Sequence, residues 1–225
     1  MTHPHLPRVI VAEALGTAGL LCAVVGSGVM AERLAGGNVA IALLANTLAT
    51  GAALIALLLT FGPVSGAQLN PVVTIAAALL GELRWPQALA MVAAQVAGAV
   101  GGVVVAHAMF EQTLLQASTK ERSGPGQWLA EVVATAGLLL VIAGVGRTRA
   151  SAVPFAVAAW VIGAYWFTSS TSFANPAVTL ARGLTDTFAG IRPGDVPAFV
   201  AAQLVGGVAG ALLGRWLFSR PVESP

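Results

Sequence analysis

The chain has 225 residues, of which 57% are hydrophobic and 9% are charged, and its mean hydropathy is +0.85. This composition excludes an ordinary soluble globular domain, in which about a quarter of the residues carry a charge. The 11 Lys and Arg residues outnumber the 9 Asp and Glu residues, but they stand singly at the ends of apolar runs and form no basic patch for nucleic acid.

Six apolar segments are long enough to cross a bilayer, because about 20 apolar residues span ~30 Å of hydrocarbon. The sequence predicts transmembrane helices over residues 9–31, 39–61, 86–110, 127–146, 152–167 and 196–218. Two further apolar pieces, residues 69–80 and 174–184, are too short to cross and are predicted to be re-entrant half-helices. The predicted fold class is therefore an all-α polytopic membrane protein.

An even number of spans places both termini on the same side of the membrane. The short loop with Arg147 and Arg149 favours a cytoplasmic N-terminus, because basic residues gather on the cytoplasmic side. We expect a multi-pass protein of the inner or plasma membrane with both termini in the cytoplasm. The lone cysteine, Cys22, excludes a disulfide framework, and no side chains stand at metal-ligand spacing, so we expect neither a metal nor a cofactor.

The sequence contains two similar halves. Residues 12–28 (AEALGTAGLLCAVVGSG) match residues 130–146 (AEVVATAGLLLVIAGVG) at nine of seventeen positions. The pairs NPVVTIA at 70–76 with NPAVTLA at 175–181, and VAAQVAGAVGG at 92–102 with VAAQLVGGVAG at 200–210, follow in the same order. We predict one channel domain over residues 1–225, with a first repeat at about 9–110, a linker at 111–126 and a second repeat at about 127–218. Each repeat has an odd number of spans, so the second enters from the opposite side and the pathway lies between the halves.

An Asn-Pro pair opens each predicted half-helix. Proline suits the first helical position, where no N–H is needed, and the asparagine side chain caps the free backbone N–H groups. If the two positive N-terminal ends meet at the bilayer centre, cations and protons face an electrostatic barrier there. The amides of Asn70 and Asn175 then orient a neutral hydroxylated solute.

The segment 65–74 (SGAQLNPVVT), the second motif at 175–177 and the glutamate of each repeat resemble the major intrinsic protein family, the aquaporins and aquaglyceroporins. The resemblance covers nearly the whole chain. It implies a six-helix right-handed barrel with two half-helices, a pore in each subunit and a homotetramer in the lipid bilayer, and it implies no enzymatic activity. It assigns the pore constriction to Asn70, Pro71, Val72, Asn175, Pro176 and Ala177.

The sequence departs from the family pattern at two pore positions. The first motif reads Asn-Pro-Val, so Val72 is expected to alter the packing or the width at the constriction slightly. The family's filter arginine after the second motif is replaced by Val178, and family spacing places the other filter positions at Thr50, Gly163 and Ser172. All four residues are small and uncharged, which predicts a filter wide enough for solutes larger than water.

The segment 168–191 (TSSTSFANPAVTLARGLTDTFAGI), together with this filter and Val72, looks like the aquaglyceroporins associated with bacterial arsenic resistance. Arsenous acid is neutral at pH 7, carries three hydroxyls and is similar to glycerol in size and polarity. We therefore expect a passive channel for arsenous acid and methylated arsenicals, with glycerol and water among its other solutes. One alternative is a glycerol or water facilitator, in which bulky neighbours such as Phe173 or Trp166 fill the filter. A second alternative is a proton-coupled secondary transporter.

Three charged residues lie within or beside the apolar segments. Glu13 and Glu131 occupy equivalent repeat positions, and two interpretations are open. They either relay protons or accept hydrogen bonds from the irregular backbone that leads into a half-helix, as the family resemblance implies. Arg182 stands four residues after Val178, about one helical turn nearer the outside. It either attracts anions such as methylated arsenate at a vestibule, or it pairs with Asp186 or reaches the headgroups.

Overall fold

The computed structural model describes residues 5–218, which fold into α-helices and two short 3-10 turns. Six helical segments are long and apolar enough to cross a membrane, which confirms the predicted fold class. The long helices are α1 (Leu6–Leu34), α2 (Val39–Ser65), α4 (Trp85–Met109), α5 (Pro125–Thr148), α6 (Val153–Phe167) and α8 (Val196–Phe218). The 3-10 turns, η1 (Ala150–Ala152) and η2 (Pro193–Asp195), lead into α6 and α8.

The two short apolar pieces form α3 (Pro71–Leu79) and α7 (Pro176–Arg182). Both begin at the proline of an Asn-Pro pair, as the sequence predicts. The largest difference from the predicted bounds is in α2, which continues past Phe61 and through Pro63 to Ser65. It ends there because Gly66 adopts a left-handed conformation with φ 84°.

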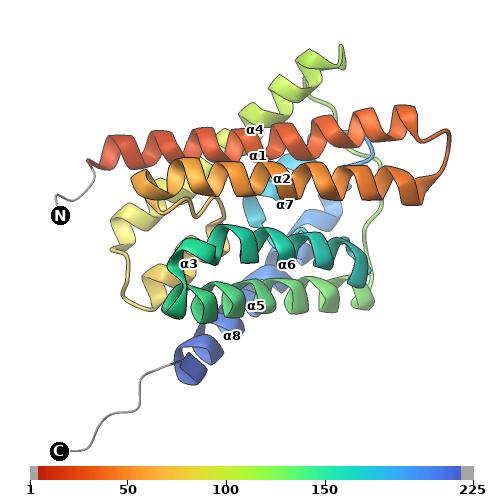
Figure 1. Cartoon of the computed structure of the whole chain (residues 1–225). Helices are drawn as coiled ribbons and strands as arrows, with labels where there is room; N and C mark the ends of the chain where they lie inside the picture. Colours follow the sequence, from red (N-terminus) through yellow and green to blue (C-terminus); the bar gives the residue numbers. More distant parts are fainter. Residues whose placement is uncertain (1–4, 219–225) are drawn as a thin grey trace, which may run out of the picture.

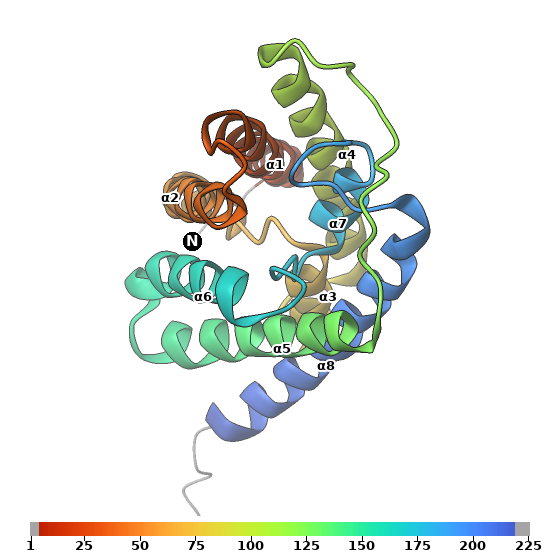
Figure 2. The same ribbon diagram turned by 90° about the vertical axis from the view of Figure 1, so that its right-hand side faces the viewer.

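The long helices surround α3 and α7, as Figure 2 shows. The start of α1 and the end of α8 lie at one end of the molecule, and the loop between α4 and α5 lies at the other (Figure 1). We call these the termini end and the linker end. The half-helix α3 runs from the middle toward the termini end, whereas α7 runs toward the linker end. This is the opposed arrangement expected of an inverted repeat.

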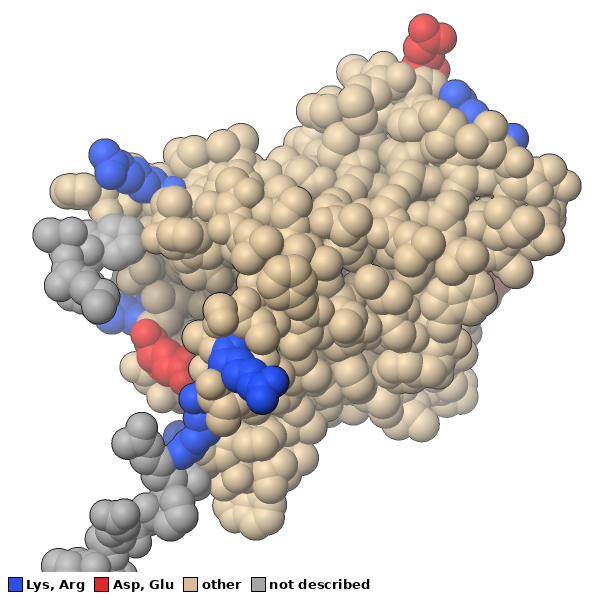
Figure 3. Space-filling model, in the orientation of Figure 1, with Lys and Arg blue, Asp and Glu red and all other residues tan. Residues whose placement is uncertain are grey.

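Charged side chains gather at the two ends of the molecule. The face in Figure 3 has a broad middle band that carries neither Lys and Arg nor Asp and Glu. Large apolar side chains within the long helices are exposed, including Val11, Leu15, Leu48 and Val133. Such a belt matches the hydrocarbon of a bilayer, so the charges meet water or headgroups at either side.

Two helix pairs pack with their backbones in contact. A Cβ on Gly98 or Gly102 in α4 would overlap backbone carbonyl groups of α1, and a Cβ on Gly206 or Gly210 in α8 would overlap those of α5. The G-x-x-x-G spacing thus allows close helix packing in both halves, as in other membrane proteins. The equivalent pairs α1/α4 and α5/α8 form the two sides of the frame that holds the half-helices.

The segment 111–126 is more than a linker between repeats. It crosses the linker end beside α7 (Figure 2) and pairs with the chain that follows α7. Ser118 N donates to Gly183 O at 3.1 Å, and Gln116 N donates to Leu184 O at 3.2 Å. The segment therefore builds part of the wall at this end of the molecule.

Candidate functional site: the central cavity and its linker-end mouth

The two asparagines cap the two half-helices in the same way. Asn70 Oδ1 accepts from Val72 N at 3.0 Å, and Asn175 Oδ1 accepts from Ala177 N at 3.0 Å and Val178 N at 3.3 Å. Both asparagines have extended backbones before the first helical residue, as N-caps do. Pro71 and Pro176 occupy the first helical positions, where the missing N–H costs nothing.

The same asparagines also join the half-helices to each other. Asn70 Nδ2 donates to Ala174 O at 2.8 Å, and Asn175 Nδ2 donates to Leu69 O at 2.8 Å. The two N-terminal ends therefore meet in the middle of the molecule, and their dipoles place positive potential there. Each amide group has two hydrogens, so one on each asparagine remains free to donate into the cavity that both residues line.

The chain entering each half-helix has an unusual backbone. Ala67 and Leu69 in the first repeat have φ of 44° and 48°, and Ser172 and Ala174 in the second have φ of 47° and 48°. A left-handed conformation of a residue other than glycine is uncommon and costs about 1–3 kcal/mol. These segments have no helical pairing of their own, so other groups must hold them.

Glu13 holds the first of these segments. Its Oε1 accepts from Ser65 Oγ at 2.6 Å and from Gln68 N at 3.0 Å, and its Oε2 accepts from Leu69 N at 2.8 Å. Gln95 Nε2 donates to Glu13 Oε2 at 2.7 Å and thereby connects the carboxylate to α4. The carboxylate is fully buried, and these donors offset the cost of its burial.

Glu131 holds the second segment in the equivalent manner. Its Oε1 accepts from Phe173 N at 2.9 Å, and its Oε2 accepts from Ala174 N at 2.8 Å and Gln203 Nε2 at 2.7 Å. Neither Glu13 nor Glu131 lines the cavity, and each carboxylate is occupied by backbone donors. These contacts support the hydrogen-bonding interpretation over a proton relay.

A cavity of about 850 Å³ is lined by residues of both half-helices and extends toward both ends of the molecule. Glu82, Arg147 and Arg215 line it at the termini end, and Tyr165 and Arg182 line it at the linker end. Both asparagines lie on its wall between these two groups. Residues 5–218 contain no three His, Cys, Asp or Glu side chains placed to hold a metal ion.

Three of the four predicted filter residues line the cavity. Thr50, Ser172 and Val178 are 2%, 3% and 5% exposed, and the hydroxyls of Thr50 and Ser172 have no hydrogen-bond partner within the described chain. Gly163 is not among the lining residues, and a Cβ there would face the outward-facing ring of Phe167 at 3.7 Å. On α6, Val161 and Tyr165 face the cavity instead.

Two bulky side chains enter the mouth from positions outside the predicted filter. Phe173 lines the cavity, and the guanidinium carbon of Arg182 lies 3.4 Å from the centroid of its ring. Trp166 is 48% exposed on the outside of α6 and is not among the lining residues. The mouth is therefore partly filled by an aromatic ring and a cation, although Val178 itself carries neither.

Arg182 does not pair with Asp186 and does not reach outward to headgroups. It is 3% exposed, and its Nε donates to Ala189 O. Asp186 instead accepts from Thr119 N at 2.8 Å and Thr119 Oγ1 at 3.0 Å. Both alternatives to the vestibule hypothesis are thus wrong in this structure, and Arg182 faces the cavity.

The side chain of Val72 points away from the cavity. Val72 is 2% exposed, and its Cγ1 occupies the space that a Cβ on Gly207 of α8 would need. The neighbouring Val73 lines the cavity. Of the two expected effects of Val72, the structure supports altered packing rather than altered width.

Comparison with known proteins identifies the fold and the family. The family model of the major intrinsic proteins matches residues 1–174. The chain belongs to the major intrinsic protein family. Its members are membrane channels and not enzymes, so this chain is a multi-pass membrane channel for small solutes.

Relatives in this family match along nearly the full length of the chain. Aquaglyceroporin AqpS from Rhizobium meliloti (strain 1021) is 52% identical over 219 residues, which cover 96% of this chain and 94% of that protein. Aquaporin Z from Bradyrhizobium diazoefficiens is 31% identical over 227 residues and 93% of each chain. The crystal structure of the aquaglyceroporin from Plasmodium falciparum superposes with a TM-score of 0.70 over 97% of both chains at 19% identity, and thus shares the fold.

Proposed function

We propose that this major intrinsic protein is a passive channel for small uncharged hydroxylated solutes. Its favoured solutes are arsenous acid and methylated arsenicals, and glycerol also passes. The observation that carries the proposal is the pair of free amide hydrogens on Asn70 and Asn175, which face one cavity from opposed half-helices. A passing hydroxyl group accepts from these amides at the middle of the pore.

The wall of the cavity suits such a solute because it is polar along one part and apolar along the rest. Leu20, Val24, Leu54 and Leu138 form apolar wall, whereas the segments before the half-helices and the two asparagines form its polar part. A solute that leaves water must regain its hydrogen bonds or lose several kcal/mol. Glycerol and arsenous acid, with three hydroxyls each, can form them along the polar strip.

Positive potential along the pore excludes cations. The N-terminal ends of α3 and α7 meet at the asparagines, and Arg182 adds a full charge at the linker-end mouth. No carboxylate lines this mouth in the described part of the chain. Protons and metal cations therefore meet a barrier that a neutral solute does not.

Val178 supports the arsenical part of the proposal, and Phe173 favours a second candidate. A valine at the family's arginine position removes a long side chain from the wall, which leaves room for a methylated solute. Phe173 and Arg182 fill part of the same mouth, however, so a glycerol or water facilitator is the second candidate. The two candidates differ in the largest solute that the mouth admits.

Flux into proteoliposomes distinguishes these candidates. Uptake of arsenous acid, methylarsenate, glycerol and water is measured for the natural channel, for Val178→Arg and for Val178→Leu as an uncharged control of similar bulk. The arsenical proposal predicts that the natural channel passes all the arsenicals and that Val178→Arg loses the larger ones while retaining water. Rapid water flux without arsenical flux, unchanged in Val178→Arg, would leave the facilitator as the function.

A third variant tests the role of the aromatic ring in the mouth. Phe173→Ala should raise the flux of the methylated solutes relative to water if the ring limits solute size. If Phe173→Ala leaves every relative flux unchanged, the ring does not define the filter.

We also propose a homotetramer with both termini in the cytoplasm. The cavity is enclosed by residues of one chain, which supports one pore in each subunit. Native mass measurement in detergent tests the tetramer. Labelling of cysteines introduced one at a time beside Arg149 and Lys120, in a Cys22→Ser background and in intact cells, tests the orientation.

A further inference from the structure

The linker-end mouth contains a buried arginine that forms no ion pair with a carboxylate of residues 5–218. Within residues 5–218, the only hydrogen bond of the Arg182 side chain runs from its Nε to Ala189 O. Its two terminal nitrogens have no hydrogen-bond partner there, although the residue is 3% exposed and lines the cavity. The guanidinium group is held in place by Phe173, whose ring centroid lies 3.4 Å from Cζ.

A second buried arginine approaches the same ring from the segment between α4 and α5. Arg122 Cζ lies 5.0 Å from the Phe173 centroid, and its side chain is held by Nε donating to Gly190 O at 2.8 Å and Nη1 donating to Ser170 O at 3.3 Å. Burial lowers the pKa of Arg122 to about 10, so it remains protonated at neutral pH. Two like charges therefore lie close together beside one aromatic ring.

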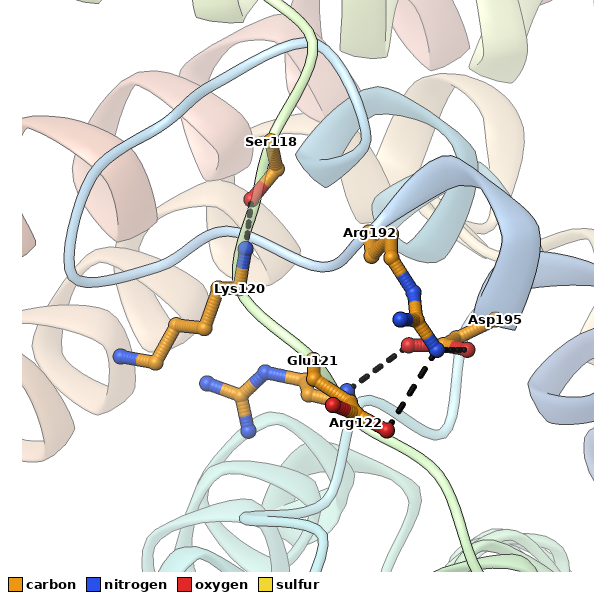
Figure 4. A network of polar contacts seen from close by, with 6 residues as sticks. All are labelled: Ser118, Lys120, Glu121, Arg122, Arg192 and Asp195. Carbon is orange, nitrogen blue, oxygen red and sulfur yellow. Dashed lines mark hydrogen bonds and ion pairs between the residues drawn. The ribbon is translucent and has the colours of Figure 1, made fainter.

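The carboxylates of this region are engaged elsewhere. Asp195 accepts from Arg192 Nη2 at 2.8 Å and from the backbone N of Arg122 at 2.9 Å, on the side away from the Arg122 guanidinium (Figure 4). Glu131 lies behind the mouth, where its oxygens accept from the backbone of Phe173 and Ala174. Lys120 extends in the same direction as Arg122 in Figure 4, and its ammonium group donates to Phe188 O at 2.7 Å.

Hydrogen-bond donors without partners also point to a ligand at this position. The hydroxyl of Ser172 is buried, has no partner within the described residues and lines the cavity together with Arg182. A planar guanidinium with free terminal nitrogens can bind two oxygens of one oxyanion at once. Such a contact is strong here because the site is largely shielded from bulk water.

We propose that Arg182, Arg122 and Phe173 form a binding site for a small, singly charged tetrahedral oxyanion in the linker-end mouth. Arg182 binds two oxygens of the ion, Ser172 donates to a third, and Arg122 supplies a second positive charge from behind the ring. The proposal rests on the proposed function only in taking this cavity as the solute pathway. Because the ion and glycerol then share one mouth, a bound oxyanion slows glycerol entry.

Methanesulfonate is a suitable probe because it is a tetrahedral monoanion that stays ionised across the working pH range. Glycerol flux into proteoliposomes is measured while methanesulfonate replaces chloride on both sides at constant ionic strength. The variants are Arg182→Met, which keeps the bulk without the charge, and Arg182→Lys, which keeps the charge. Arg192→Met is the matched control, because Arg192 is a partly exposed arginine already paired with Asp195.

The proposal predicts that methanesulfonate inhibits glycerol flux through the natural channel and through Arg192→Met with similar inhibition constants. The inhibition constant should rise about tenfold or more in Arg182→Met and by a smaller factor in Arg182→Lys. Equal inhibition in Arg182→Met and the natural channel, or no inhibition of the natural channel, would overturn the proposal.

Calorimetric titration of methanesulfonate into the detergent-solubilised protein gives a readout that does not depend on flux. Binding to the natural protein and to Arg192→Met, with weaker binding to Arg182→Met, supports the site even if Arg182→Met fails to conduct. The absence of binding to the natural protein overturns it. Absence of glycerol flux through the natural channel, by contrast, contradicts the proposed function and leaves the titration as the test of the site.

Discussion

The contact between Val72 and Gly207 allows the packing of α3 on α8 to be tested by a double-mutant cycle. A Cβ on Gly207 would overlap Val72 Cγ1 and lie 3.5 Å from Val72 Cβ. Val72 cannot easily move, because it is 2% exposed and a β-branched side chain in a helix has one strongly preferred rotamer. Gly207→Ala is therefore expected to overpack this interface.

The magnitude follows from two opposed effects. Overpacking a buried contact costs about 1–3 kcal/mol, whereas replacing glycine by alanine in a helix recovers about 1 kcal/mol. Gly207→Ala should thus lower the free energy of unfolding by up to about 2 kcal/mol. Val72→Ala alone removes two methyl groups and leaves a cavity, at a cost of about 2–3 kcal/mol.

The double variant should be more stable than the sum of the two single effects predicts. It places alanine at both positions, as the other repeat does with Ala177 and Ala99, which are both fully buried. Because the new Cβ fills part of the space left by the valine methyl groups, we expect a coupling energy of at least about 1 kcal/mol.

Reversible unfolding of the detergent-solubilised protein measures the four free energies, and glycerol flux shows that the pore remains open. Additive single effects would refute the overlap. A changed solute preference in Val72→Ala would show that this side chain contributes to the width of the pore after all.

Three further predictions concern the buried carboxylates, the helix contacts and the charge of the mouth. Glu131→Gln replaces a carboxylate with an amide that has one acceptor oxygen, so at least one buried backbone donor loses its partner. We expect the free energy of unfolding to fall by about 3 kcal/mol. Unchanged thermal stability with loss of pH-dependent uptake would instead indicate proton relay. Gly98→Ala should lower the yield of folded protein in size-exclusion chromatography, because its Cβ meets the backbone of α1, whereas Gly101→Ala on the same helix meets nothing within 4 Å and should have no effect. The pKa of Lys120 is lowered to about 8 by burial first and then by the neighbouring guanidinium groups, against the opposing charge of Glu32. Lys120 therefore loses its charge as the pH rises through 8, so between pH 7 and 8 inhibition by methanesulfonate should weaken more in the natural channel than in Lys120→Arg, and an equal change in the two channels would contradict this assignment.

The sequence by itself determined the spans, the half-helices and their caps. Apolar length decides whether a segment can cross a bilayer, and this property is local, so the six spans are found within a few residues of their predicted bounds. The Asn-Pro pairs fix the starts of α3 and α7 for an equally local reason, because asparagine caps and proline fits the first helical position. Repetition of these signals predicted the opposed arrangement of the two halves.

Only the tertiary structure decided which side chains fill the mouth of the pore. Spacing placed Gly163 there, but the packing of α6 against its neighbours turns Val161 and Tyr165 toward the cavity. The left-handed residues before α7 direct Phe173 inward, and the return of the chain after α7 holds Arg182 against it. Arg122 carries no signal in the sequence, because it comes from a segment whose position depends on hydrogen bonds to residues some 50 to 70 positions away. Such contacts between distant parts of the chain have no local pattern, and the selectivity of the pore depends on them.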